Sequence, residues 1–216
     1  MKYGESLFDV LYLCFAIASG IVILKKARNK TEKMMGLAAL VLGCGDAFHL
    51  VPRVLNYFIK ADFTAPLGIG KLVTSVTMTL FYVLMYEVWS GYYHEAKDLR
   101  TERIIWLLAA LRIVLCLFPQ NQWLTNGNDL TWSILRNVPF VILGGIIIVL
   151  YFRKCAETKT FRPVWLYILL SFLFYIPVAV GAMFVPMLGM LMLPKTICYV
   201  LILVSFLKAV LRDTAR

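Results

Sequence analysis

Residues 34–58, MMGLAALVLGCGDAFHLVPRVLNYF, form a long apolar run that is broken by only three ionisable side chains. A helix needs about 20 predominantly apolar residues to cross the hydrocarbon core of a bilayer, and this run is long enough. The three exceptions are Asp46, His49 and Arg53. Charge inside a membrane span is costly, so such residues usually face the bundle interior or a wet cavity and are candidates for function.

The composition of the whole chain agrees with a membrane protein. Of the 216 residues, 61% are hydrophobic and 16% are charged, and the mean hydropathy is +0.80. Soluble domains have about 45–50% apolar and about 25% charged residues. The net charge of +10 then indicates basic loops facing the cytoplasm and anionic lipid rather than a nucleic-acid partner. Two histidines and five scattered cysteines have no metal-ligand spacing, so we predict neither a metal nor a cofactor.

Seven runs of this kind occur along the chain. We therefore predict an all-α integral membrane bundle of seven transmembrane helices, which forms a single domain over residues 1–216. The predicted spans are 7–24, 34–58, 66–90, 103–119, 131–152, 163–184 and 187–208.

Lysine and arginine are distributed unevenly between the predicted loops. One side of the bundle carries Lys25, Lys26, Arg28, Lys30 and Lys33, then Lys97, Arg100 and Arg103, then Arg153, Lys154, Lys159 and Arg162, and finally Lys208, Arg212 and Arg216. The other side carries Lys2 and Lys60, and the connection 119–131 has no basic residue. Because cytoplasmic loops carry the excess of Lys and Arg, we predict a cell-membrane protein with its N-terminus outside and its C-terminus in the cytoplasm.

The orientation lets polar residues on different helices be compared by depth. Asp46, His49 and Arg53 have the spacing i, i+3 and i+7, which places them on one helical face from mid-membrane outward. The other spans contribute polar side chains near the middle or in the outer half, namely Lys71, Ser75, Arg112, Arg136, Tyr175 and Lys195. Five cations against one carboxylate predict an anionic ligand, such as a phosphate, a carboxylate or a lipid headgroup.

Structural explanations for these charges stay open. Arg53, Lys71 and Arg136 are close enough to the outer interface to extend their charged ends into water. Asp46 could neutralise Lys195 or Arg53, and a buried Asp46–Lys195 pair could serve only to fix two helices together. A carboxylate near an imidazole instead favours proton transfer, which makes Asp46 and His49 candidates for acid–base catalysis.

The segment 45–53, GDAFHLVPR, resembles the region around the membrane aspartate of the lysoplasmalogenase family, whose helix carries the pattern GDxxLLxP. The matching residues are Gly45, Asp46, Leu50 and Pro52. Residues 65–83 are similar to that family's next helix, with matches at Gly70, Ser75 and Tyr82, and residues 193–206 are similar to its last helix. The resemblance implies a multi-span protein that hydrolyses lysoplasmalogen vinyl ethers, with one N-terminal span fewer than the family's usual eight.

Two departures from the family pattern concern its chemistry. The family has a second aspartate on its penultimate helix, where this chain has Tyr175 and Ile176. The family's histidine on the helix after the GD pattern is replaced here by Val76 or Thr77.

Three functions are compatible with these residues. The first is a lipid-handling hydrolase for a lysophospholipid-like substrate, in which Asp46 and His49 act as acid and base. The substrate-binding residues would then be Arg53, Lys71, Ser75, Arg112, Arg136, Tyr175 and Lys195. The second is a non-enzymatic transporter or receptor for a small anion, and a distant third is a retinal protein with its chromophore on Lys195. The sequence does not determine the oligomeric state.

Overall fold

The computed structural model describes residues 2–96, 98–127, 129–182 and 184–213. Lys97 and Arg216 of the predicted basic loops, and Met183 of the sixth predicted span, lie outside these ranges. The described residues contain no strand. The helices are α1 (Lys2–Lys26), α2 (Lys30–Phe58), α3 (Thr64–Tyr92), α4 (Leu99–Leu117), α5 (Leu130–Arg153), α6 (Val164–Gly181) and α7 (Met192–Asp213), with 3₁₀ helices η1 (Pro119–Asn121), η2 (Trp123–Thr125) and η3 (Pro186–Leu191).

The predicted all-helical membrane fold is confirmed. Within the described ranges, six helical segments are long and apolar enough to cross a membrane. A seventh is added if α4 and the 3₁₀ turns that follow it, bent by 70° from one another, count as one span. Helix α4 alone is not among the six segments, and it carries four charged residues, Arg100, Glu102, Arg103 and Arg112.

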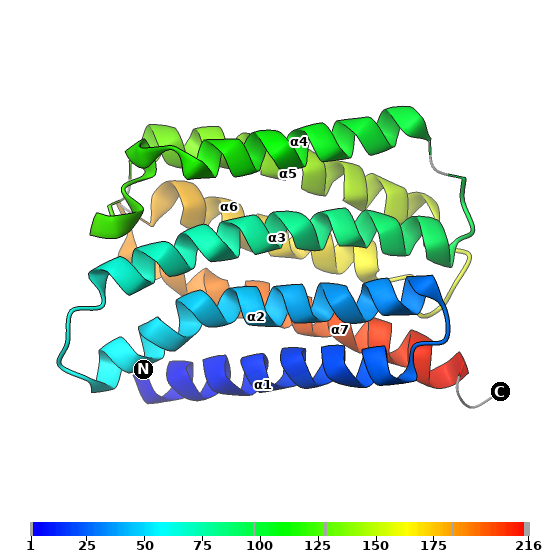
Figure 1. Ribbon diagram of the computed structural model, residues 1–216, viewed down its shortest axis with the longest axis horizontal. Coiled ribbons are helices and arrows are strands. Elements are labelled where there is room, and N and C mark those ends of the chain that lie inside the picture. Colours follow the sequence, from blue (N-terminus) through cyan, green and yellow to red (C-terminus); the bar gives the residue numbers. More distant parts are fainter. Residues whose placement is uncertain (1, 97, 128, 183, 214–216) are drawn as a thin grey trace.

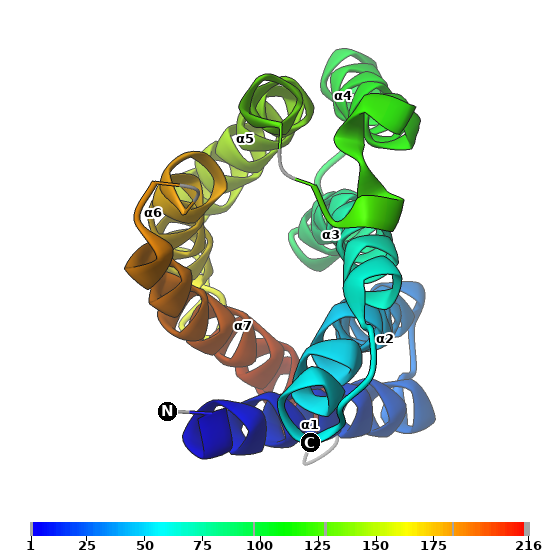
Figure 2. The same ribbon diagram turned by 90° about the vertical axis from the view of Figure 1, so that its left-hand side faces the viewer.

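The helices run along one common direction and form a closed ring around the long axis (Figures 1 and 2). Each helix contacts the next one along the chain, and α7 closes the ring against α1 and α2. Helix α3 also contacts α5, which brings α3 toward the middle of the bundle. Helix α1 begins and α7 finishes at opposite ends (Figure 1).

Polar side chains set where several helices begin. Asn29 caps α2 by accepting a hydrogen bond from the Glu32 backbone N–H at 2.8 Å, and Glu32 in turn accepts one from the Arg28 backbone N–H at 2.6 Å. This reciprocal arrangement satisfies N–H groups that the first helical turn leaves without partners. Asp98 and Asp129 cap α4 and α5 in a similar way.

The connections at the end of the bundle where α2 ends differ in part from the predicted ones. The sixth helix ends at Gly181 rather than at residue 184. The seventh apolar segment begins at Met187, as predicted, although the α-helix α7 begins only at Met192. A 3₁₀ helix, η3, occupies the intervening stretch because Pro186 starts a new helical turn there and Gly189 weakens its continuation as an α-helix. The connection 119–131 is also not a simple loop, since η2 folds back onto α3 and η1 contacts α5 (Figure 2).

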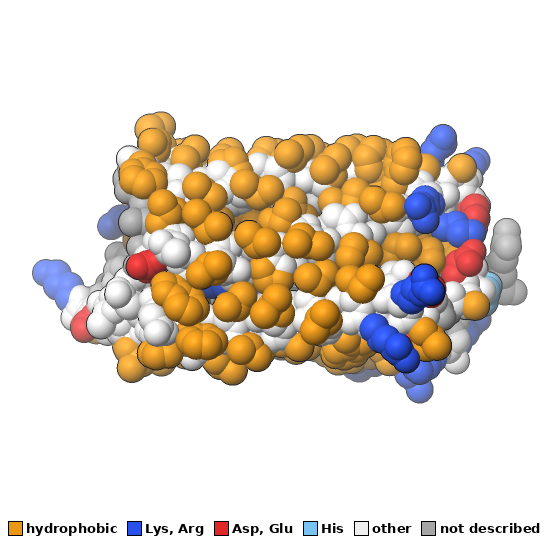
Figure 3. All heavy atoms as spheres, turned by 90° about the horizontal axis from the view of Figure 1, so that it is seen from above, with side chains coloured by type: hydrophobic (Ala, Val, Ile, Leu, Met, Phe, Trp, Pro, Cys, Tyr) orange, Lys and Arg blue, Asp and Glu red, His pale blue; other side chains and the backbone are white. Residues whose placement is uncertain are grey.

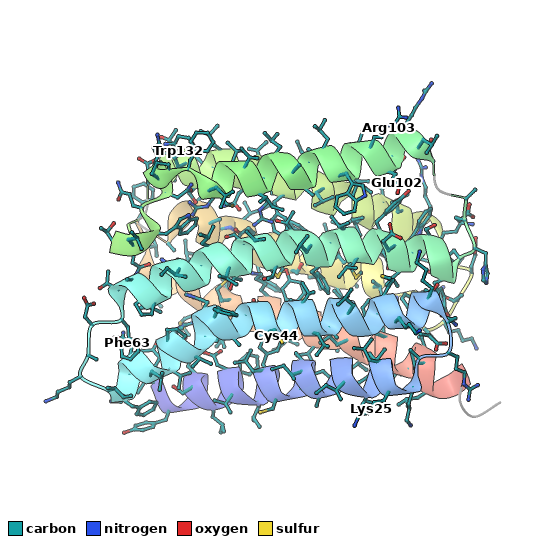
Figure 4. All side chains as sticks on the ribbon, viewed as in Figure 1. Lys25, Cys44, Phe63, Glu102, Arg103 and Trp132 are labelled. Atoms are coloured by element: carbon teal, nitrogen blue, oxygen red, sulfur yellow. The ribbon has the colours of Figure 1, made fainter. Side chains whose placement is uncertain are left out.

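Charged and apolar side chains occupy different parts of the surface. Apolar side chains cover the middle of the face seen in Figure 3, and Lys and Arg side chains gather at the end where α1 finishes and α2 begins. Lys25 and Arg103 lie toward this end, Phe63 and Trp132 lie toward the other, and Cys44 lies about midway along α2 (Figure 4). Asp46, two residues after Cys44, is therefore close to mid-length of the bundle.

Helix α3 contacts the backbone of α2 at Gly70. A Cβ atom added there would overlap the Phe48 carbonyl oxygen and lie 2.7 Å from His49 Cα, both of which belong to the α2 backbone. A backbone cannot move aside as a flexible side chain does, so this contact requires glycine. It also holds the His49 backbone at a defined distance from α3.

We expect Gly70→Ala to lower the free energy of unfolding by about 1–3 kcal/mol, as overpacking generally does. The melting temperature of the purified protein in detergent measures this. Gly145→Ala is the matched control, because nothing lies within 4 Å of a Cβ at Gly145, and alanine is favoured over glycine in a helix by roughly 0.5–1 kcal/mol. Equal melting temperatures for the two variants would contradict this close packing.

Candidate functional site

Two adjoining cavities lie inside the bundle, in the half where α2 ends and α3 begins. The first, the basic cavity, has a volume of about 230 Å³. The second, the acidic cavity, has a volume of about 240 Å³. Both are lined by His49, Thr74, Met192 and Lys195, so these residues form the boundary between them.

The predicted site residues all line one cavity or the other. The basic cavity is lined by His49, Lys71, Ser75, Arg112, Arg136, Tyr175 and Lys195, together with other residues defined below. The acidic cavity is lined by Asp46, His49, Arg53 and Lys195, and also by Glu5 and Asp9. Arg53 is therefore separated from the other predicted phosphate ligands, whereas His49 and Lys195 face both groups.

Four helices each deliver one cation to the basic cavity. Lys71 comes from α3, Arg112 from α4, Arg136 from α5 and Lys195 from α7. No carboxylate lines this cavity in the part of the chain that the structure describes. Because burial of an unpaired charge is costly, the cavity is electrostatically complementary to an anion.

Arg112 is the most deeply buried of these cations. Arg112 is 2% exposed, and its Cζ atom lies 3.3 Å from the centre of the Phe140 ring. A cation over an aromatic face is stabilised by the ring quadrupole. Nevertheless, Arg112 Nε and Nη1 have no hydrogen-bond partner among the described residues. These two N–H groups are buried and unsatisfied, which makes Arg112 a candidate for anion binding.

Arg136 is held by the connection that follows α4. Its Nη1 donates a 2.6 Å hydrogen bond to Asn121 Oδ1, and its Cζ lies 4.7 Å from the Trp123 ring centre. Asn121 is fixed in turn because its Nδ2 donates to the carbonyl oxygens of Leu115 and Phe118, at 2.8 and 2.9 Å. The 3₁₀ turns η1 and η2 thus position a cation and close one wall of the basic cavity.

Lys195 lies against aromatic rings at the boundary of the cavities. Its Nζ is 4.6 Å from the ring centre of Tyr175 and 5.6 Å from that of Tyr199. The Tyr175 hydroxyl donates a 2.7 Å hydrogen bond to Asn137 Oδ1, which fixes the Tyr175 ring under the ammonium. The rings stabilise the cation without neutralising it.

The acidic cavity decides between the two partners expected for Asp46 and adds a carboxylate that the sequence analysis did not expect. Arg53 forms an ion pair with Glu5 of α1, whereas Lys195 lines the acidic cavity together with Asp46. Asp46 Oδ2 accepts a 2.6 Å hydrogen bond from the Tyr12 hydroxyl. Asp46 is also not the single carboxylate at this depth, because Asp9 is 4% exposed and lines the same cavity.

Sequence reasoning missed the contribution of α1. Glu5, Asp9 and Tyr12 have the spacing i, i+4 and i+7, which places them on one face of the first span. The same rule had identified the triplet on α2, so the signal was present. Asn121 and Trp123 were missed for a different reason, since nothing in their sequence shows that the loop folds back onto α3.

His49 lies where the two cavities meet, and its Nδ1 has no hydrogen-bond partner within the described ranges. A neutral imidazole has one nitrogen that accepts a proton and one that donates it. Because Nδ1 is buried without a partner at the boundary of the two cavities, His49 is a candidate for proton exchange with a bound group.

Comparison of the chain with protein-family models, with curated proteins and with solved structures gives no match. One cavity suits an anion, and the other brings the buried Asp9 and the half-buried Asp46 together with an imidazole.

We expect inorganic phosphate to stabilise the wild-type protein through Arg112. Arg112→Met should leave the melting temperature in phosphate-free buffer unchanged or higher, because it removes a buried cation with unsatisfied N–H groups. The rise in melting temperature on adding phosphate should be smaller in Arg112→Met than in the wild type. At a phosphate concentration about a hundredfold above Kd, that rise corresponds to ~2.7 kcal/mol in the wild type.

Arg100→Met is the matched control, since Arg100 lies on the same helix but is exposed. It should keep the full stabilisation by phosphate. Differential scanning fluorimetry measures the rise in melting temperature on adding phosphate. An equal rise in the two variants would contradict a role of the basic cavity in anion binding.

Proposed function

We propose that the protein is a seven-span membrane protein that binds the anionic headgroup of a lipid-derived molecule in the basic cavity and hydrolyses it. The observation that best supports this proposal is that four cations line one cavity, which no carboxylate lines in the described part of the chain. Arginine offers paired N–H groups to phosphate or carboxylate oxygens, and lysine adds a compact charge.

We infer that the two cavities face the outside of the cell. The Lys- and Arg-rich loops at the other end of the bundle support this orientation, because such loops remain in the cytoplasm. Water and a lipid from the outer leaflet would then reach the cavities from the same side. In this arrangement α4, together with η1 and η2, provides the seventh span.

His49 and Asp46 are the proposed proton-transfer pair. In the proposed reaction a water oxygen forms a bond to the substrate carbon that carries the leaving oxygen, while His49 takes a proton from that water. The bond between this carbon and the leaving oxygen then breaks. The leaving oxygen receives a proton from Asp46, and the proton on His49 returns to Asp46 through water, so the net change is addition of one water molecule. Tyr12 holds one oxygen of Asp46 in place for this exchange.

The resemblance to lysoplasmalogenases is consistent with this proposal in two respects. It includes Asp46, and it implies a lipid substrate for a multi-span protein. The family's second aspartate has no counterpart at Tyr175, whose hydroxyl instead donates to Asn137. Asp9 of α1 supplies a second buried carboxylate to the acidic cavity. We propose that Asp9 takes the place of the missing acid.

A non-enzymatic anion transporter or receptor is the second candidate. It is favoured by Arg112, whose Nε and Nη1 lack partners in the described chain and can bind an anion without any chemistry. Stabilisation by phosphate without hydrolysis of any lipid would select this function. Turnover would select the first.

We expect Asp46→Asn and His49→Gln each to reduce lysophospholipid hydrolysis by roughly 10²–10⁴-fold, the usual contribution of general acid–base catalysis. Asparagine keeps an oxygen that accepts the Tyr12 hydrogen bond, so the fold is preserved. The assay supplies acyl and vinyl-ether lysophospholipids to sealed right-side-out and inside-out vesicles. Mass spectrometry then follows the release of the hydrocarbon fragment.

His94→Asn is the control, because His94 is exposed beyond the far end of α3 and has a positive φ of 53° that asparagine tolerates. It should retain full turnover. Undiminished activity of Asp46→Asn would refute the catalytic assignment. Activity confined to inside-out vesicles would refute the orientation and leave the catalytic assignment standing.

A further inference from the structure

An apolar groove of about 280 Å³ runs between α5 and α6 on the outside of the bundle. On α5 it is lined by Ile134, Val138 and Ile142, which follow one another at intervals of four residues and are 42–50% exposed. On α6 it is lined by Ile176 and Val180, which are 40% and 43% exposed. These side chains belong to the surface that faces lipid.

The groove adjoins the basic cavity. Ser133, Asn137, Tyr175 and Ala179 line both spaces. Two hydrogen bonds join α5 to α6 at this boundary, from Ser133 Oγ to the Ala179 carbonyl at 3.1 Å and from the Tyr175 hydroxyl to Asn137 Oδ1 at 2.7 Å. The polar residues of the groove are therefore found where it meets the four cations.

The two spaces together have the polarity of an amphiphile. One side of the boundary is a hydrocarbon surface, and the other contains Arg136 and Lys195. A lipid molecule can place its headgroup beside these cations while its chain stays in the apolar phase, because lipid tails and apolar side chains are equally good solvents for it. No part of such a molecule has to be transferred to an unfavourable solvent.

The dimensions fit one hydrocarbon chain. From Ser133 to Ile142 helix α5 rises by about 14 Å at 1.5 Å per residue. The residues that line the groove come from α5 and α6. Sites for drug-sized molecules occupy about 300–1,000 Å³, so the groove is too small for a complete two-chain phospholipid. Pro139 and Pro177 lie inside the two helices at this level, and each removes one backbone hydrogen bond that would stiffen the wall.

We propose that the α5–α6 groove holds the single hydrocarbon chain of an anionic amphiphile whose headgroup occupies the basic cavity. The boundary formed by Ser133, Asn137, Tyr175 and Ala179 is then a lateral gate to the bilayer, and its two hydrogen bonds are individually weak enough to exchange. This inference rests on the proposed anion binding. It adds where the hydrocarbon chain of the ligand lies and that the ligand has a single such chain.

Photo-cross-linking in phosphatidylcholine vesicles tests the proposal. The probe is dodecyl phosphate with a diazirine in its alkyl chain, and the comparison probe is the corresponding dodecanol, which lacks the phosphate. We expect the phosphate probe to label residues 134–142 and 176–180 roughly tenfold more than the alcohol does, a factor equivalent to 1.4 kcal/mol. Peptide mass spectrometry measures the labelling.

Val138→Trp fills the groove and should abolish this preference on residues 176–180. Val149→Trp is the matched control, because Val149 is on the same helix and equally exposed, at 48% against 50%, but lies outside the groove. It should leave the labelling unchanged. Equal labelling by the two probes, or an equal effect of the two variants, would overturn the proposal.

Stabilisation by inorganic phosphate is measured on the same samples. If phosphate stabilises the protein but the phosphate probe shows no preference for the groove, the inference fails and anion binding stands. If phosphate stabilises neither the wild type nor the Val138→Trp variant, anion binding itself fails, and the gate falls with it.

Discussion

Four cationic side chains inside an apolar bundle are the constraint on which the rest of this structure depends. Each cation loses hydration when it is buried, and a positive neighbour adds repulsion. Lys71, Arg112, Arg136 and Lys195 nevertheless converge on one cavity that no carboxylate lines in the described chain, and of the four only Lys195 also faces the acidic cavity. Aromatic rings and one asparagine reduce the cost, but they leave the positive charge in place.

The fold separates this charge from the remaining ionisable groups. Helix α1 brings Glu5, Asp9 and Tyr12 to Arg53 and Asp46, and α4 and α5 bring Arg112 and Arg136 to the opposite side of α3. The ring of helices keeps the two sets apart, except at His49 and Lys195, which face both cavities. An imidazole and a cation therefore stand between the cation-lined cavity and the carboxylates of the acidic cavity. Under the proposed function, this arrangement would couple anion binding to proton transfer.

Much of the fold and part of the site could be predicted from the sequence. Long apolar runs leave few alternatives to helices, because a backbone inside a membrane must satisfy its own hydrogen bonds. The same helical spacing that grouped Asp46, His49 and Arg53 on α2 applies to α1, so Glu5 and Asp9 were within reach of sequence analysis. Depth arguments also grouped residues from α3, α4, α5 and α7 at one level, and these residues do line adjoining cavities.

Other features depend on tertiary contacts that no local pattern encodes. The pairing of Arg53 with Glu5 requires α1 to pack beside α2 in one particular rotation. The positioning of Arg136 by Asn121 requires the connection after α4 to fold inward, whereas its polar composition is typical of an exposed loop. The break before α7 follows from Pro186 and Gly189, two residues whose effect on a membrane helix depends on its neighbours.

An experimental structure of the protein in its native lipids tests the central claim most directly. The account predicts density for an anionic group within hydrogen-bonding distance of the Arg112 and Arg136 guanidinium groups, and continuous density for one chain leading to the α5–α6 groove. It would be contradicted if the Arg112 and Arg136 side chains pointed to the bundle exterior and the space between α3, α5 and α7 were closed by apolar packing.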